Sequence, residues 1–155
     1  MIITEKWDRK YLELAKYIAH NWSKDPSTKV AAVLVNYEYG KEFIGYNGFP
    51  YGVDDAPERY ENRELKYKLV VHAEINALNK AGDYAKGATL YVYPSLTLPP
   101  ICNECAKLAI QKQIKEVVGY YCDEESEQVQ RWKEANIYSV MMFKEAGITW
   151  RGLKE

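Results

Sequence analysis

Four side chains in the sequence have the types and spacing of a metal-dependent hydrolytic site. His72 and Glu74 are separated by one residue. Further along the chain, Cys102 and Cys105 form a C-x-x-C pair, whose sulfurs project from one face of a helix and can bind one metal ion. His72 and Glu74 lie about 200° apart around a regular helix, so they converge only off its N-terminal end, toward which side chains tilt.

This set predicts a catalytic zinc ion. One histidine and two cysteines supply three ligands, which leaves the fourth position of a tetrahedral ion for water. Bound zinc lowers the pKa of its water to about 7, and Glu74 is then placed to move protons. We expect both motifs to begin helices, because two positive helix ends would then favour thiolates and a developing oxyanion. The alternative interpretation is a redox or structural cysteine pair, with a buried histidine and a surface glutamate.

The composition limits the class of protein. The chain has 155 residues, 47% hydrophobic and 28% charged, which is typical of one globular domain over residues 1–155. A net charge of -1 counts against a polynucleotide partner. The sequence has no apolar run of membrane-spanning length, and its start does not resemble a signal peptide. Three cysteines, with Cys122 as the odd one, are no secreted disulfide framework, so we expect a cytoplasmic protein without a membrane partner.

Hydrophobic periodicity and turn residues divide the chain into alternating elements. Helices are expected at 4–22, 63–81, 102–111 and 126–146, and strands at 30–35, 41–46, 90–93, 116–119 and 148–150. The first two strands are expected to form a hairpin, and a loop rich in turn formers is expected at 47–61. After the hairpin, the alternation of strands and helices indicates a mixed sheet with helices on both faces.

Several motifs together resemble the zinc-dependent cytidine and deoxycytidylate (dCMP) deaminases. They occur in the family's order, as Ser23-Lys24-Asp25-Pro26, Gly45-Tyr46-Asn47-Gly48-Phe49-Pro50, Lys66-Tyr67, Val71-His72-Ala73-Glu74-Ile75-Asn76-Ala77 and Cys102-Asn103-Glu104-Cys105-Ala106-Lys107. H-A-E followed by C-x-x-C is the signature of zinc nucleobase deaminases. The likeness runs from about residue 4 to about residue 151.

The resemblance implies an α/β fold, the cytidine-deaminase-like three-layer αβα sandwich with a mixed five-stranded sheet. It also implies hydrolysis of dCMP to dUMP and ammonia, with one catalytic Zn²⁺ per chain held by His72, Cys102 and Cys105. Zinc-bound hydroxide would attack C4, and Glu74 would carry the proton to N3 and then to the leaving amine. Homo-oligomers, commonly hexamers, and allosteric control by dCTP and dTTP with Mg²⁺ follow from the same resemblance.

Residues outside the four-residue set are expected to contact nucleotides. By resemblance, the effector segment contains Gly45, Tyr46, Asn47 and Gly48, although these glycines could instead only turn the chain. Asn47 also matches a position near the substrate sugar in related deaminases.

The substrate itself is expected to contact two further regions. Lys24, beside Ser23, is expected to bind the 5′-phosphate, with a solvated cation as the alternative. Tyr120 or Tyr121 follows a strand end that borders the pocket in such folds and is expected to stack on the base. Core or interface packing is the alternative for both tyrosines.

The sequence departs from the family pattern close to the first cysteine. Ile101 stands where members usually carry proline, and the loop from Tyr93 to Ile101 is longer than usual. Ala31 stands where glycine is common. Because the backbone of that loop normally reads the cytosine edge, its length bears on the substrate. The alternatives are deamination of dCTP or deoxycytidine, or a zinc-stabilised binding module without activity.

Overall fold

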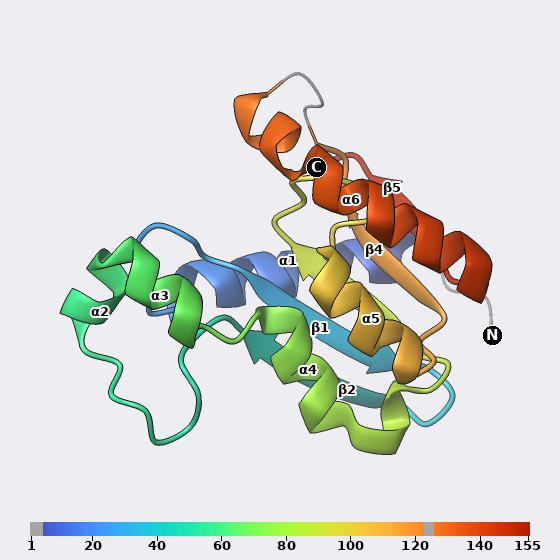
Figure 1. The fold of residues 1–155 in the computed structure, drawn as a ribbon. Coiled ribbons are helices and arrows are strands. Elements are labelled where there is room, and N and C mark those ends of the chain that lie inside the picture. Colours follow the sequence, from blue (N-terminus) through green and yellow to red (C-terminus); the bar gives the residue numbers. More distant parts are fainter. Residues whose placement is uncertain (1–4, 123–125) are drawn as a thin grey trace.

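A mixed five-stranded sheet forms the centre of the molecule in a computed structural model, which describes residues 5–122 and 126–155 (Figure 1). In chain order its strands are β1 (Ala31–Asn36), β2 (Lys41–Tyr46), β3 (Thr89–Tyr93), β4 (Glu116–Tyr120) and β5 (Thr149–Leu153). Their spatial order is β2-β1-β3-β4-β5. β1 is antiparallel to β2 and β3, whereas β3, β4 and β5 run parallel, so the predicted mixed sheet is confirmed.

Helices cover both faces of this sheet. α1 (Glu5–Trp22) packs on one face, and α4 (Ala73–Ala81), α5 (Asn103–Gln111) and α6 (Glu127–Ala146) lie on the other (Figure 1). Successive strand residues point to opposite faces, so Val33 joins the α1 core and Leu34 joins the core under α4, α5 and α6. Both residues are fully buried, which explains the continuous apolar run of β1.

The predicted helix over 63–81 is wrong as one element. Instead, α3 (Arg63–Leu69) ends before Val70 and Val71, and α4 begins at Ala73. The break occurs because Val71 and Gly48 exchange two backbone hydrogen bonds, Val71 N to Gly48 O at 2.7 Å and Gly48 N to Val71 O at 3.2 Å. This pairing requires extended backbone at Val71, whatever the local helix propensity.

The expected loop at 47–61 contains a short helix that the sequence analysis missed, α2 (Pro57–Glu61). Proline is favoured in the first turn of a helix, where its missing N–H costs nothing. α2 and α3 project together from one side of the sheet (Figure 1). A 3-10 turn, Gly82–Ala85, extends α4. The expected start of the first helix, residue 4, lies outside the described residues. Among the described helices, none has an apolar stretch that could cross a bilayer.

Candidate metal centre

Two helices begin at the two sequence motifs, as predicted. His72 is the N-cap residue of α4 and Cys102 is the N-cap residue of α5. The Cys102 Sγ accepts a hydrogen bond from the backbone N–H of Cys105 at 3.5 Å, which caps the first turn of α5. A helix N-terminus carries a partial positive charge, so both caps favour an anionic ligand set between them.

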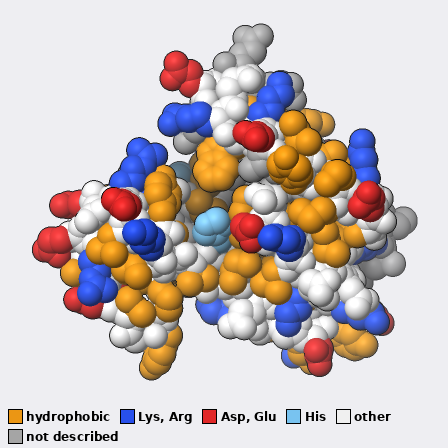
Figure 2. Space-filling view, in the orientation of Figure 1, with side chains coloured by type: hydrophobic (Ala, Val, Ile, Leu, Met, Phe, Trp, Pro, Cys, Tyr) orange, Lys and Arg blue, Asp and Glu red, His pale blue; other side chains and the backbone are white. Residues whose placement is uncertain are grey.

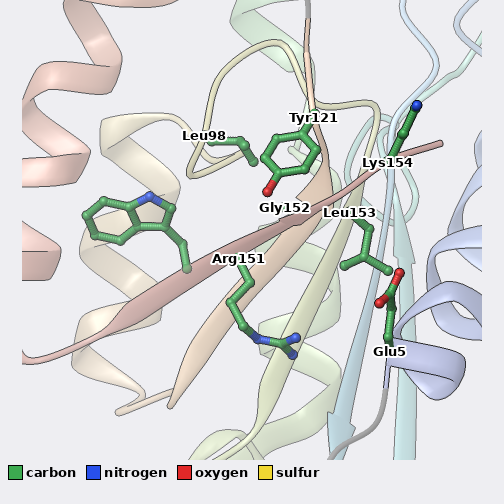
Figure 3. A pocket seen from close by; sticks show the side chains of 8 residues that line it. Glu5, Leu98, Tyr121, Arg151, Gly152, Leu153 and Lys154 are labelled. Atoms are coloured by element: carbon green, nitrogen blue, oxygen red, sulfur yellow. The ribbon is translucent and has the colours of Figure 1, made fainter.

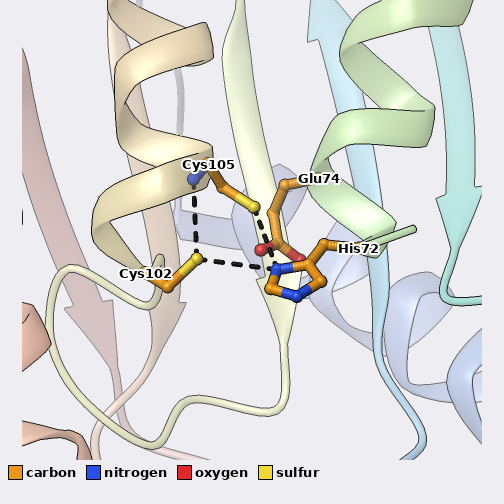
Figure 4. A group of neighbouring side chains, drawn as sticks. All are labelled: His72, Glu74, Cys102 and Cys105. Atoms are coloured by element: carbon orange, nitrogen blue, oxygen red, sulfur yellow. Dashed lines mark hydrogen bonds between the residues drawn. The ribbon is translucent and has the colours of Figure 1, made fainter. Parts of the chain in front are cut away.

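The four candidate side chains point toward one another from these helix ends (Figure 4). The Nδ1 atom of His72 lies 3.2 Å from the Cys105 Sγ and 3.5 Å from the Cys102 Sγ. With Glu74 included, the four ligand atoms all lie within 4.8 Å of one another. The predicted convergence of the H-x-E and C-x-x-C motifs is therefore confirmed.

The separations between these atoms fit a zinc ion. Zinc bonds of 2.0–2.1 Å to nitrogen and 2.3 Å to sulfur, in tetrahedral geometry, place the two donors about 3.5 Å apart. The two measured nitrogen–sulfur distances, 3.2 and 3.5 Å, are close to this value. Imidazole and thiolate are donors that suit zinc. The other histidine, His20, packs elsewhere, edge-on to the ring of Tyr93.

The environment shifts the pKa of all four groups. The hydrogen bond with Cys102, together with burial, raises the pKa of the Cys105 thiol. The Cys102 thiol has a pKa lowered to about 4, first by its hydrogen bond with Cys105 and further by His72. The hydrogen bond with Cys102 raises the pKa of His72. Burial raises the pKa of Glu74, whose side chain is almost wholly enclosed. A thiolate next to a carboxyl that holds its proton more tightly than an ordinary glutamate provides both a metal ligand and a proton carrier.

The metal centre is open to solvent on one side. His72 is exposed, Cys102 is partly buried, and Glu74 and Cys105 are buried. The face drawn in Figure 2 has a hollow near its centre, in which a histidine side chain reaches the surface. A small molecule can therefore approach the His72 side while Glu74 stays shielded from water.

Ser23 and Asn47, expected to contact the substrate, lie together in a buried network. The Asn47 Oδ1 accepts hydrogen bonds from the Ser23 hydroxyl at 2.7 Å and the Val30 N–H at 3.1 Å. Its Nδ2 donates to the Thr28 carbonyl at 2.7 Å. These bonds hold the segment after α1 against the end of β2.

Lys24, the predicted phosphate ligand, is exposed and forms an ion pair with Asp55. The structure therefore gives this cation an acidic partner from the segment before α2. An exposed pair of this kind contributes little stability, so an anionic group can displace the carboxylate at small cost.

The structure does not bring Tyr120 to the metal centre. Tyr120 is buried in the core next to α1, on the opposite face of the sheet from α4 and α5, and its hydroxyl donates to Glu13. Tyr121 is exposed and lies beside Leu98 and Gly152, at a cavity of about 670 Å³ along β5 (Figure 3). Tyr120 is the last residue of β4 and Tyr121 directly follows it, so the alternation of side chains along extended backbone points the two tyrosines to opposite faces.

The expected effector segment lies against the segment that carries the metal centre. Gly45 faces the backbone of α4, and the Tyr46 carbonyl accepts a hydrogen bond from the Asn76 side chain at 2.9 Å. Gly48 pairs with Val71, the residue before His72. The segment is therefore linked directly to the start of α4.

A buried ion pair between α3 and the segment after α1 was not predicted from the sequence. The Lys66 Nζ lies 3.2 Å from Asp25 Oδ2, and the two side chains are only 4% and 1% exposed. Asp25 also accepts hydrogen bonds from the N–H groups of Ser27 and Thr28. The pair therefore ties α3 to the loop that holds Asn47. Both partners occur in motifs that carry the family resemblance, which was the available signal.

Comparison with known proteins identifies the class. Residues 5–121 match the family described as the cytidine and deoxycytidylate deaminase zinc-binding region. The chain belongs to this family of zinc-binding deaminases. The resemblance drawn from its motifs is thereby confirmed.

The relatives include deaminases from distant organisms. Deoxycytidylate deaminase of Mus musculus is 41% identical over 155 residues, which cover 94% of this chain and 79% of the mouse protein. An uncharacterized deaminase in the luxG 3′ region of Aliivibrio fischeri is 37% identical over 150 residues, covering 94% and 93% of the two chains.

Solved structures share the fold. The dCMP deaminase of the cyanophage S-TIM5 in apo form has a TM-score of 0.68 at 21% identity, covering 97% of this chain and 100% of that one. The same enzyme in complex with dCMP and dUMP gives a TM-score of 0.66 at 20% identity, with coverage of 98% and 100%. The cytidine-deaminase-like fold expected from the sequence is confirmed.

Proposed function

We propose that this protein, acting as a single domain, hydrolyses dCMP to dUMP and ammonia. The observation that carries the proposal is the convergence of one imidazole nitrogen, two sulfurs and a buried carboxylate at two helix starts. The substrate is inferred from the relatives, since the mouse protein and the cyanophage protein are both dCMP deaminases.

In this proposal His72, Cys102 and Cys105 hold one zinc ion per chain. Zinc, when bound, supplies Lewis-acid activation of a water molecule. The backbone N–H of Cys105 orients the Cys102 sulfur, and the two helix ends favour the negative charge of the thiolates. These residues therefore set the place at which water meets C4 of the cytosine ring.

Glu74 is the proton carrier of the proposed reaction. Its carboxylate takes a proton from the attacking water and delivers it to N3 of the ring, and it then transfers a second proton to the departing amine. Two protons and one oxygen of water are thus distributed between dUMP and ammonia. The raised pKa of Glu74 supports this role, because a general acid works best when its pKa is near the operating pH.

The nucleotide contacts are proposed for the segments around this centre. We assign Asn47 and Ser23 to the sugar side of the pocket and Lys24 to the 5′-phosphate. The exposure of the Lys24–Asp55 pair supports the last assignment. Tyr121 remains the candidate for base stacking, whereas Tyr120 is left out because its ring is enclosed in the core.

Regulation is part of the proposal. We infer that dCTP, with Mg²⁺, activates and dTTP inhibits a homo-oligomer, a hexamer by family resemblance, through Gly45, Tyr46, Asn47 and Gly48. The hydrogen bonds between Gly48 and Val71 support this, because they link the segment to His72. A cytoplasmic location fits the pair of thiolate ligands, which needs a reducing compartment.

One experiment tests the activity. Zinc-loaded protein is incubated with dCMP, dCTP, deoxycytidine and CMP, and ammonia release is followed with Glu74→Gln as the control. The proposal expects the highest kcat/KM for dCMP. Faster release from dCTP or deoxycytidine would reassign the substrate, and no release from any of them by a zinc-containing protein would indicate a binding module.

A further inference from the structure

The loop that leads into Cys102 is held by α6, a helix from a distant part of the chain. The Ser139 hydroxyl donates to the carbonyl oxygen of Ile101 at 3.0 Å. One turn earlier on α6, the Asn136 Nδ2 donates to the carbonyl oxygen of Leu98 at 3.2 Å. Two side chains of one helix thus hold two carbonyls of one loop, and the carbonyl of Ile101 belongs to the residue directly before Cys102.

The hydrogen bond between Ser139 and Ile101 is enclosed, which strengthens its hold on the loop. Ser139 is 0% exposed and Ile101 is 3% exposed, so water does not compete for the hydrogen bond. β4 closes the loop in from a second direction, because a Cβ on Gly119 would stand 2.7 Å from Pro100 Cγ. The backbone just before Cys102 is therefore confined between β4 and α6.

We propose that Ser139 is a positioning residue for Cys102, and that Asn136 supports the same loop. This inference rests on the proposed role of Cys102 as a zinc ligand. Fixing the Ile101 carbonyl fixes the peptide plane that joins Ile101 to Cys102, and so the direction of the Cys102 side chain. Partners hydrogen-bonded directly to a metal ligand typically change metal affinity about 10–100-fold when they are removed, so a contact to the preceding residue should act at the lower end of that range.

The two side chains that hold this loop come from outside the part of the chain that matches the family. The family match ends at residue 121, whereas α6 begins at Glu127. α6 also anchors itself in the core through Phe143, which is fully buried. The helix therefore provides an anchored support for the loop that precedes Cys102.

Helix propensity does not explain why position 139 carries a serine. Alanine is the better helix former, and it would fit the enclosed site without steric conflict. A buried serine in a helix can also bond to the preceding turn of its own helix. Here it donates across to the loop instead, which is the contact that alanine would remove.

The test measures zinc affinity rather than turnover. Ser139→Ala and Asn136→Ala are compared with the parent protein by zinc competition against a chromophoric chelator, and by the thiolate charge-transfer bands of the cobalt(II)-loaded protein. Tyr138→Ala is the matched control, since Tyr138 lies between the two residues in sequence and is 49% exposed. Thermal unfolding of the metal-free proteins shows whether α6 remains folded.

We expect Ser139→Ala to weaken zinc binding by about 10-fold, with altered cobalt bands. The metal-free variant should still unfold cooperatively, at a somewhat lower temperature than the parent, because the buried Ile101 carbonyl loses its donor. Asn136→Ala weakens binding less, and Tyr138→Ala leaves it unchanged. Parental zinc affinity in both Ser139→Ala and Asn136→Ala would overturn the inference. If Ser139→Ala does not fold, the zinc affinity of Asn136→Ala decides whether α6 positions the loop. A parent protein that binds zinc but releases no ammonia would contradict the proposed function and leave this inference standing.

Discussion

Gly45 lies directly against the backbone of α4, so that a Cβ on Gly45 would stand 2.3 Å from the carbonyl oxygen of Ala73. The same Cβ would lie 2.4 Å from the amide nitrogen of Ala77. Both are backbone atoms, which cannot rotate away as a side chain can. The helix that carries Glu74 therefore has its present place only because position 45 has no side chain.

Gly45→Ala should displace α4 from β2. We expect the free energy of unfolding to fall by about 1–3 kcal/mol, as is typical for overpacked sites, and zinc affinity to fall with it. Urea denaturation and zinc titration measure the two effects. Gly48→Ala is the control for stability, because a Cβ there meets only the Tyr60 hydroxyl at 3.8 Å. Equal losses in the two variants would contradict the explanation.

Glu74→Gln should keep zinc and lose most turnover. The amide has almost the shape of the carboxyl group but cannot carry a proton to N3 or to the amine. General acid–base catalysis typically contributes about 10²–10⁴-fold, so kcat should fall by that factor. Ammonia release and elemental analysis provide the measurements. A rate above about a tenth of the parent's would remove Glu74 from the mechanism.

Cys102→Ala and Cys105→Ala should each lose zinc, because neither leaves enough soft donors beside His72. Cys122→Ser should keep a full complement, since Cys122 is not part of the cluster formed by the described residues. Elemental analysis of protein purified without chelators tests both statements. Two zinc ions per chain, or zinc loss from Cys122→Ser, would be incompatible with this ligand set.

Lys66→Met should destabilise the protein strongly. It leaves the Asp25 carboxylate, only 1% exposed, without its cation, and breaking a buried pair costs about 3–5 kcal/mol. Chemical denaturation measures the change, and adding Asp25→Asn should recover part of it. Lys68→Met is the matched control, because the Lys68–Glu64 pair is exposed. A loss in Lys68→Met as large as in Lys66→Met would show that burial is not the cause.

Velocity should depend sigmoidally on dCMP concentration if the Gly45–Gly48 segment binds effectors. dCTP should then make the curve hyperbolic, and dTTP should suppress activity. Allosteric coupling of this kind is typically about 5–150-fold in affinity. Steady-state kinetics decide the matter, since hyperbolic dCMP curves with purely competitive dTTP inhibition would exclude a separate effector site.

The strands and the metal centre could be predicted because their signals are local. The apolar run of β1 reflects burial on both faces, and each motif of the centre sits at a helix start within a few residues of sequence. The motif at His72 indicates a helix start, but periodicity runs one helix from residue 63 through it, so the extended residues between α3 and α4 could not be predicted in this way. The break depends on backbone pairing between Gly48 and Val71, whose partners are far apart in the sequence.

Contacts between side chains of separate segments could not be predicted from the sequence either. Asp25 and Lys66 are separated by 41 residues, and neither residue alone indicates a buried pair. Tyr120 and Tyr121 are neighbours in sequence, so only the register of β4 against α1 decides which of them is enclosed. Sequence periodicity describes single elements, whereas these contacts depend on how the elements meet.

The two hydrogen bonds between Gly48 and Val71 have a consequence for how this protein can change over evolution. Because they join the two ends of residues 49–70, that segment leaves the core and returns to it at one place. Between Gly48 and the buried Tyr60, the exposed residues 50–54 form a cassette that can be replaced or lengthened while His72 keeps its position. New recognition properties can therefore arise in this cassette while the chemistry of the centre is inherited unchanged.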